Sequence, residues 1–332
     1  MSTWLWAGVL VVAAWAAHWG ADQLLTPLKM LRKQWGLTAS AGAAFLAIVT
    51  ASPEVAVNIT SAARGVSDIG LGNLLGSNII SIPLMVTIAY FASRKQFKTN
   101  TKHQEHLDAD LLALNKRSVS VLSLPYLGII ALVAVLTLPK AWRGLQPIDG
   151  WIMLGAYGAF LTHAIVKGRK KGEQVEWTQK KVGLSITGAF AIAAGAFFIV
   201  KATESIVSAL SISEIVGGLF ITGIMTTAPE VFKTWSVVKG GEVTAGTTSV
   251  IADNAITMTV AFFPLALVTT PVEDFQLYWA NLAFVGLMPL LYSVFVHQSK
   301  HLHGFSKWQI FVFDAAYVAY LLIMALFVLK LF

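Results

Sequence analysis

Ten stretches of mostly apolar residues constrain this chain more than any other feature. A hydrocarbon layer of about 30 Å needs roughly 20 residues of helix to cross it, and each stretch meets that length. The stretches are residues 4–25, 38–63, 69–92, 119–138, 150–168, 183–207, 213–238, 244–270, 276–297 and 309–331. Charged residues make up only 12% of the chain, against about 25% in soluble domains. The sequence therefore predicts an all-α membrane protein with ten transmembrane helices.

Charge and cysteine content narrow the class further. The chain has no cysteine, so neither a disulfide framework nor a thiolate metal site can form. The net charge of +7 could suggest nucleic-acid binding, but the basic residues lie between the apolar stretches, as in loops that flank a membrane. The connections after odd-numbered stretches carry 18 of the 24 Lys and Arg residues. This predicts that both termini face outside, in the inner or plasma membrane of the cell.

One motif occurs twice in the chain, 176 residues apart. Residues 50–54 read TASPE and residues 226–230 read TTAPE. Five predicted helices precede the midpoint and five follow it, so the second half would enter the membrane in the opposite sense. We therefore predict two inverted five-helix repeats, residues 1–168 and 183–332, joined by a cytoplasmic linker at 169–182. Further identical pairs at this offset are Gly42/Gly218, Ile48/Ile224, Val55/Val231, Gly65/Gly241 and Asn78/Asn254.

The two motif acids, Glu54 and Glu230, are predicted to face each other near the middle of the membrane. The prolines before them cannot donate a hydrogen bond, which frees the carbonyls of Val49 and Met225. Free carbonyls are tolerated in a membrane only where they line a cavity. Carboxylates, hydroxyls and carbonyls together form an all-oxygen site, which suits hard cations such as Na⁺ and Ca²⁺. Two buried carboxylates also require a cation or a proton to offset their charge.

The helix that follows each motif supplies further polar side chains. Ser77, Asn78 and Ser81 correspond to Asp253, Asn254 and Thr257 at the same offset of 176. Ser77 and Ser81 are four residues apart, as are Asp253 and Thr257, so each of these two pairs is predicted to share a helix face. Asp253 is either a cation ligand or a local hydrogen-bonding partner. The candidate cation ligands are Glu54, Glu230, Asp253, Thr50, Ser52, Thr226, Thr227, Ser77, Asn78, Ser81, Asn254 and Thr257. We expect no catalytic residue and no cofactor, with inorganic cations as substrates.

The two motif-bearing segments, about 40–92 and 215–268, resemble the alpha-repeats of the cation/calcium exchanger superfamily, which includes the sodium/calcium exchangers. In that pattern a Ser/Thr-Pro-Glu helix is followed by a Gly-Ser-Asn-Ile helix, as in residues 72–79 (GNLLGSNI). The resemblance implies exchange of a divalent cation, typically Ca²⁺, against Na⁺ or H⁺ by alternating access. It also implies that Glu54 and Glu230 are the central ligands, with hydroxyl oxygens from Thr50, Thr226, Thr227 and Ser77.

Four positions depart from the family pattern. Ser81 and Thr257 stand where exchangers usually carry a further acidic or amide ligand, Asp253 replaces a serine, and Ala51 lacks a hydroxyl. Selectivity and stoichiometry are therefore not inherited from the resemblance. A proton-coupled or monovalent-cation exchanger, a channel and a membrane-embedded enzyme with paired carboxylates stay open as alternatives.

Five further ionisable residues lie inside predicted helices. Lys233, close after Glu230, either extends to the cytoplasmic surface or forms an internal ion pair that takes one cation position. Lys201 and Glu204 are three residues apart and are predicted to pair. His18 and Asp22 are four apart and are predicted to form a polar pair or a proton relay. The protein is expected to contact the lipid bilayer, and its pattern is compatible with a monomer.

Overall fold

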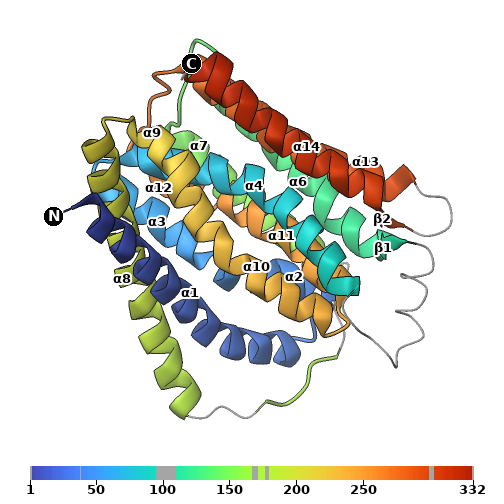
Figure 1. Ribbon diagram of the computed structural model, residues 1–332. Helices are drawn as coiled ribbons and strands as arrows, with labels where there is room; N and C mark the ends of the chain where they lie inside the picture. The colour runs from blue at the N-terminus through green and yellow to red at the C-terminus, as the bar shows by residue number, and fades with distance from the viewer. Residues whose placement is uncertain are drawn as a thin grey trace.

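The computed structural model describes residues 2–37, 39–94, 110–166, 171–175, 179–298 and 303–330. It is a bundle of helices, as predicted, with one small two-stranded sheet at one end (Figure 1). The helices are α1 (Thr3–Gln34), α2 (Ala39–Thr50), α3 (Ser52–Ala63), α4 (Ser67–Arg94), α6 (Lys116–Thr137), α7 (Pro147–Val166), α8 (Gln179–Leu210), α9 (Glu214–Gly217), α10 (Gly223–Lys239), α11 (Val243–Thr257), α12 (Phe262–Leu267), α13 (Phe275–Gln298) and α14 (Lys307–Ile323). Two π-helical turns, η1 (Gly218–Thr222) and η2 (Met324–Val328), extend α9 and α14, and the strands are β1 (Leu111–Ala113) and β2 (Gly304–Ser306).

Seven helical segments in the described part of the chain are long and apolar enough to cross a membrane. The predicted segment 38–63 is not one continuous helix, because it is divided into α2 and α3. Within segment 119–138 the apolar helical portion is the shorter Leu122–Thr137. The protein is thus an integral multi-pass membrane protein, and the count of ten crossings stays a prediction. The seven segments are Thr3–Gln34, Ser67–Arg94, Gln179–Leu210, Glu214–Lys239, Val243–Leu267, Phe275–Gln298 and Lys307–Val328.

The connections between helices gather at two opposite ends of the bundle. At one end, a backbone bridge between Leu145 and Thr270 joins the α6–α7 and α12–α13 connections. Both termini lie at this end (Figure 1). At the other end, β1 pairs with β2 and so joins the α4–α6 and α13–α14 connections. The Glu173 N–H also donates to the Lys33 carbonyl there at 3.0 Å, which links the α7–α8 and α1–α2 connections.

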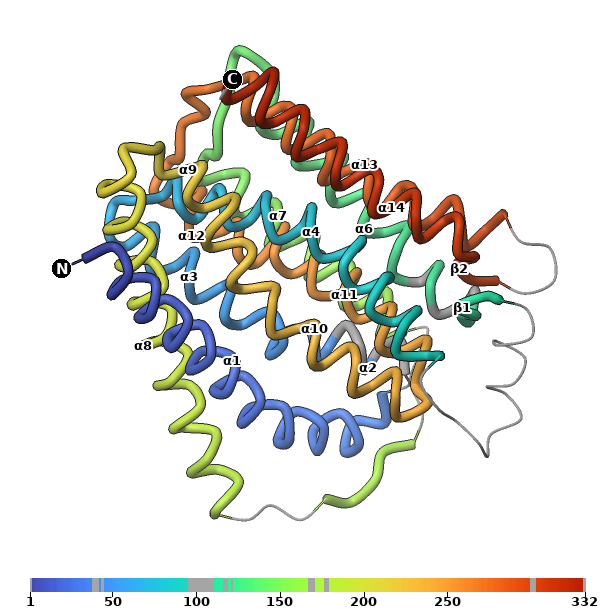
Figure 2. The backbone as a smooth tube through the Cα atoms, viewed as in Figure 1, coloured from blue at the N-terminus to red at the C-terminus, as the bar shows by residue number. Residues whose placement is uncertain are grey.

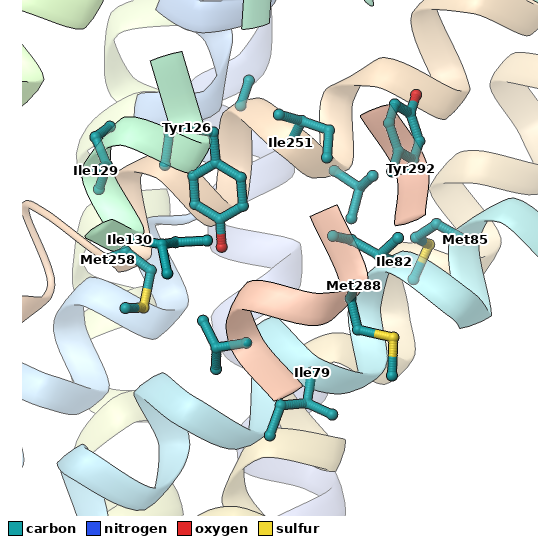
Figure 3. Close-up of a cluster of buried hydrophobic side chains, with 14 of the residues drawn as sticks. Ile79, Ile82, Met85, Tyr126, Ile129, Ile130, Ile251, Met258, Met288 and Tyr292 are labelled. Carbon is teal, nitrogen blue, oxygen red and sulfur yellow. The ribbon is translucent and has the colours of Figure 1, made fainter. Parts of the chain in front are cut away.

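The centre of the bundle is formed by α4 and α11. The apolar windows of these two spans are 78% buried, whereas the window of α8 is only 28% buried. Figure 3 shows side chains of α4, α6, α11 and α13 packed together, among them Ile79, Tyr126, Ile251 and Met288. The outer helices instead expose large apolar groups, such as Phe190 at 73%. A membrane protein needs such an apolar outer surface, so α4 and α11 are the helices placed to carry an enclosed polar site.

Helices α1 and α8 lie side by side along one flank (Figure 2). Their contact depends on two glycines, since a Cβ at Gly20 would come within 2.9 Å of Ile192 and one at Gly195 within 2.8 Å of Ala17. These two contacts are reciprocal. At an offset of 175 residues, Gly20 corresponds to Gly195 and Ala17 to Ile192. Such reciprocal contacts are what a two-fold relation between α1 and α8 would give.

Gly72 is a second point of close helix contact. A Cβ at Gly72 would lie 2.7 Å from the Leu219 nitrogen and 2.8 Å from Gly218 Cα, so α4 approaches the backbone of η1 closely. We expect Gly72→Ala to lower the free energy of unfolding by about 1–3 kcal/mol, because backbone atoms cannot move aside easily. Thermal unfolding in detergent measures this change. Gly128→Ala in α6 is the control, because a Cβ there meets nothing within 4 Å; equal melting temperatures for the two variants would contradict the expectation.

Candidate functional site

Glu54 lies just after a break in the first motif helix. α2 ends at Thr50 and α3 begins at Ser52, so the break falls at Ala51. Pro53 has no N–H and cannot bond to the carbonyl four residues earlier, which is the local cause of the break. Glu54 occupies the first turn of α3, where unpaired backbone N–H groups favour a negative side chain. The sequence thus builds a buried carboxylate at a helix start inside the bundle.

The carbonyl that Pro53 frees already has a partner. The Ser52 hydroxyl donates to the Val49 carbonyl oxygen at 2.6 Å. These two predicted oxygen ligands are therefore bonded to each other, and only their remaining lone pairs are available to a cation. Glu54 is different. It is 3% exposed, and its Oε2 atom makes no hydrogen bond to any residue that the structure describes.

The second motif has a different backbone. α10 continues through Pro229 without a break, and the irregular turn lies earlier, at η1. The hydroxyl of Thr227 donates to the Gly223 carbonyl at 2.8 Å, and that of Thr226 donates to Asn73 Oδ1 at 3.0 Å. Glu230 is partly buried on this helix. Identical Pro-Glu pairs therefore sit in two different local structures.

Asp253 connects the second repeated segment to the first motif helix. It is buried in α11 and accepts a hydrogen bond from the Thr50 hydroxyl at the end of α2. Glu54 lies in the first turn of the next helix, α3, and Glu230 lies on α10, which packs against α11. Like charges in a buried region are costly unless a cation or proton offsets them. The structure therefore places the three predicted carboxylates on neighbouring helices, and their shared role in one site stays a prediction.

The three carboxylates do not enclose an ion by themselves. In the described ranges, no three His, Cys, Asp or Glu side chains lie close enough together to hold a metal ion. Hydroxyl, amide or carbonyl oxygens would have to complete the coordination of a bound cation. Ser77 is suitable, because its Oγ atom is buried and has no hydrogen-bond partner among the residues described. Its counterpart in the other repeat is Asp253.

Four of the predicted ligands instead bond across the centre of the bundle. Asn78 donates to the Thr257 hydroxyl at 2.8 Å, and Ser81 donates to Asn254 Oδ1 at 3.0 Å. The two bonds are reciprocal, since Asn78 corresponds to Asn254 and Ser81 to Thr257 at the offset of 176. They hold α4 against α11 at equivalent positions. The described contacts thus assign these four side chains a bridging role between the two halves, and their predicted ligand role stays a prediction.

Sequence reasoning missed two polar groups near the site. The Tyr126 hydroxyl of α6 donates to Asn78 Oδ1 at 2.8 Å. Asn73 donates to Asn58 Oδ1 at 3.0 Å while it accepts from Thr226. Asn73 lies within the GNLLGSNI segment and one turn before Ser77, which is a signal that could have found it. Tyr126 carries no such signal, because it lies in an apolar helix outside the repeated motif.

Two of the lysines that the sequence singles out inside helices, Lys201 and Lys233, form ion pairs. Glu204 pairs with Lys201 at 3.3 Å, as predicted, and also with Arg64 at 2.7 Å. Asp22 pairs with Lys233, whose Nζ lies 3.4 Å from Asp22 Oδ1. The sequence left two arrangements open for Lys233, extension to the cytoplasmic surface or an internal ion pair. The structure shows the ion pair.

His18 does not take Asp22 as a hydrogen-bond partner. Its Nδ1 atom lies 3.0 Å from the Ala14 carbonyl oxygen, and its Nε2 atom has no hydrogen bond within the described part of the chain. The side chain is buried, at 4% exposure. The predicted polar pair of His18 and Asp22 is therefore not formed. His18 instead contacts Ala14 within α1, and Asp22 pairs with Lys233 of α10.

A multi-pass helical bundle that carries the carboxylates of two copies of one motif on neighbouring helices has the features of a membrane transport protein for cations. The family model described as "Sodium/calcium exchanger protein" matches residues 4–166 and 180–326. This match covers most of the chain, and the chain belongs to that family. The resemblance inferred from the sequence is confirmed.

Solved structures of the sodium-calcium exchanger NCX_Mj share this fold. The crystals soaked with 10 mM Sr²⁺ and either 2.5 or 100 mM Na⁺ give a TM-score of 0.65 at 20% identity, covering 97% of this chain and 99% of that one. The structure soaked with zero Na⁺ and Ca²⁺ gives a TM-score of 0.61 at 19% sequence identity. That match covers 96% of this chain and 98% of the exchanger chain. At this identity the likeness establishes the fold alone. No curated protein matches the chain.

Proposed function

We propose that the protein is a secondary-active antiporter that exchanges Ca²⁺, or another divalent cation, against Na⁺ by alternating access. Three carboxylates on neighbouring helices support the proposal: Glu54 is buried and its Oε2 atom bonds to no described residue, Asp253 is buried and bonded to Thr50, and Glu230 lies on α10, which packs against α11. A divalent cation or several monovalent ones would offset this charge, and both kinds suit oxygen ligands. Membership of the sodium/calcium exchanger family favours Ca²⁺ and Na⁺ as the two substrates.

The same charge can couple the two fluxes. A site that holds uncompensated buried carboxylates is costly to enclose in a low-dielectric region, whereas a cation-loaded site is not. The conformational change that exposes the site to the other side would then be favourable only with a cation bound. Ca²⁺ and Na⁺ would compete for one set of ligands. An antiporter requires that its two substrates compete for one site. It also requires that the protein cannot readily change conformation while that site is empty.

We also propose that the fold is an inverted repeat of residues 1–168 and 183–332, with ten membrane crossings and residues 169–182 as the cytoplasmic linker. Support comes from two reciprocal sets of contacts. Gly20 and Gly195 make equivalent contacts between α1 and α8, and Asn78–Thr257 and Ser81–Asn254 make equivalent hydrogen bonds. The gathering of the connections at two opposite ends is also what alternating crossings produce. The distribution of Lys and Arg favours termini that face outside, in the inner or plasma membrane.

Two features favour an exchanger with a different coupling ion. Thr257 replaces a usual acidic or amide ligand, and Lys233 brings a positive charge to the same region. Both reduce the negative charge available for cations, so a proton-coupled or monovalent-cation exchanger of the same fold is the second candidate. A membrane-embedded enzyme is the least favoured candidate, because a chain that belongs to an exchanger family needs no catalytic pair to explain its acids.

Uptake of ⁴⁵Ca²⁺ into proteoliposomes tests these alternatives. We expect uptake when the vesicles are loaded with Na⁺ and diluted into Na⁺-free buffer, and loss of uptake when monensin collapses the Na⁺ gradient. Parallel runs with an H⁺ gradient, and with Mg²⁺, Mn²⁺ and K⁺ as substrates, identify the coupling ion and the cargo. Ca²⁺ uptake driven only by H⁺ would favour the second candidate. Uptake without any counter-ion gradient would indicate a channel and contradict the proposal.

A further inference from the structure

Lys233 carries its charge inside the helix bundle. It lies three residues after Glu230 on α10, and its side chain is 23% exposed. The Nζ atom itself is buried and makes no hydrogen bond with the residues that the structure describes. Its ion pair is with Asp22, which is 51% exposed on α1. The charge of Asp22 is therefore partly screened by solvent, whereas the charge of the ammonium is not.

The buried ammonium lies on the helix that carries one of the site carboxylates. Lys233 and Glu230 are three residues apart and share one face of α10. Helix α10 packs against α11, which carries Asp253. A buried cation within reach of buried carboxylates offsets their charge more strongly than a solvated one would. An ammonium at this position can offset carboxylate charge as a bound monovalent cation would, but it is covalently attached to α10.

This positive charge has no counterpart in the other half of the chain. At the offset of 176 residues, Lys233 corresponds to Val57, which is completely buried in the apolar contact between α3 and the α1–α8 pair. The other main difference between the two halves is at Asp253, because the corresponding residue of the first half is the uncharged Ser77. One half of the chain therefore contributes both an extra carboxylate and an extra ammonium. The two differences offset each other in charge.

We propose that the Lys233 ammonium is a built-in monovalent cation of the transport site, held in place by Asp22. This inference rests on the proposed antiport. Leaving out Asp22, whose half-exposed carboxylate is screened by solvent, the three site carboxylates and the ammonium have a net formal charge of −2, which one Ca²⁺ or two Na⁺ ions neutralise. Both loaded forms of the site are then neutral, and the exchange of one for the other moves no net charge. Without Lys233 the carboxylates alone would have a formal charge of −3 and would call for one more Na⁺.

The flux ratio and its voltage dependence test this inference. In proteoliposomes of the wild-type chain, ²²Na⁺ efflux and ⁴⁵Ca²⁺ uptake are measured together, with the membrane potential set by valinomycin and K⁺. We expect about two Na⁺ per Ca²⁺ and an initial rate that does not change with the imposed potential. In Lys233→Met we expect about three Na⁺ per Ca²⁺ and a rate that changes severalfold with the potential.

Two variants separate this effect from a general disturbance. Lys233→Arg keeps the charge and should keep the wild-type ratio, whereas Lys201→Met removes a lysine from the Glu204 ion pair, outside the site, and should also leave the ratio unchanged. A wild-type ratio of three, or a Lys233→Met ratio equal to that of the wild type, would overturn the inference while leaving the antiport in place. If Lys233→Met does not fold, the wild-type ratio and voltage dependence still decide. Wild-type vesicles without Na⁺-driven Ca²⁺ uptake would overturn both the antiport and this inference.

Discussion

Replacing Glu54 or Glu230 with glutamine should abolish Na⁺-driven Ca²⁺ uptake while the protein still folds. Glutamine has nearly the same shape as glutamate, so packing is retained, but the charge that would hold the cation is lost. Removal of one partner from a buried charge pair costs about 3–5 kcal/mol. A loss of this much binding free energy weakens the apparent Ca²⁺ affinity by about 100-fold or more. Transport at ordinary Ca²⁺ concentrations should then fall to background.

The measurement is ⁴⁵Ca²⁺ uptake into proteoliposomes that contain equal amounts of folded protein, checked by size-exclusion chromatography. Glu204→Gln is the matched control, because Glu204 is a glutamate in a membrane-spanning helix that pairs with Arg64 and Lys201 away from the site. We expect Glu204→Gln to transport at close to the wild-type rate. Wild-type transport in both Glu54→Gln and Glu230→Gln would remove the two glutamates from the transport site.

Asp253→Asn should give the second largest loss. Asparagine retains an oxygen that can accept the Thr50 hydroxyl, so the contact between α11 and the first motif helix survives. The substitution removes the negative charge of Asp253, which is one of the three carboxylate charges that a bound cation would offset. We expect the Ca²⁺ concentration for half-maximal uptake to rise by about 10-fold or more, in line with the loss of roughly 1.5–3 kcal/mol for one charged contact.

Asp314→Asn is the matched control for this change. Asp314 on α14 also accepts a threonine hydroxyl, from Thr87 at 2.8 Å, but it takes no part in the site. The same chemical change should therefore leave the half-maximal Ca²⁺ concentration unaltered. If Asp253→Asn behaves like Asp314→Asn, Asp253 has only the hydrogen-bonding role that was left open for it from the sequence.

The repeated motif predicts which acids share a site, because matched spacing in two halves places equivalent residues at equivalent positions, and the facing of Glu54 and Glu230 stays a prediction. The motif was not sufficient to predict the local backbone. Pro53 and Pro229 each precede the glutamate of the repeated motif, yet the helix breaks at Ala51 in one copy and continues through the proline in the other. The irregular turn of the second copy lies earlier, at η1, where α4 packs closely against the helix, and a motif of five residues does not report such contacts with neighbouring helices.

The partner of Lys233 was also outside the reach of the sequence. A pattern of residues along one helix can show that a lysine lies near an acid, as it did for Lys201 and Glu204. It cannot show which residue of a distant helix meets that lysine. Asp22 is the partner because α1 crosses α10 at this level. The same limit applies to Tyr126, whose hydroxyl reaches Asn78 from a helix outside the motif.

Competition between Na⁺ and bound ⁴⁵Ca²⁺ on purified protein in detergent tests the central claim most directly, because it requires no gradient and no reconstitution. The antiport mechanism predicts that wild-type protein binds Ca²⁺, that Na⁺ displaces it competitively, and that Glu54→Gln and Glu230→Gln bind neither ion measurably. Ca²⁺ binding that Na⁺ does not displace, or that persists in both variants, would contradict a shared site built on these two glutamates.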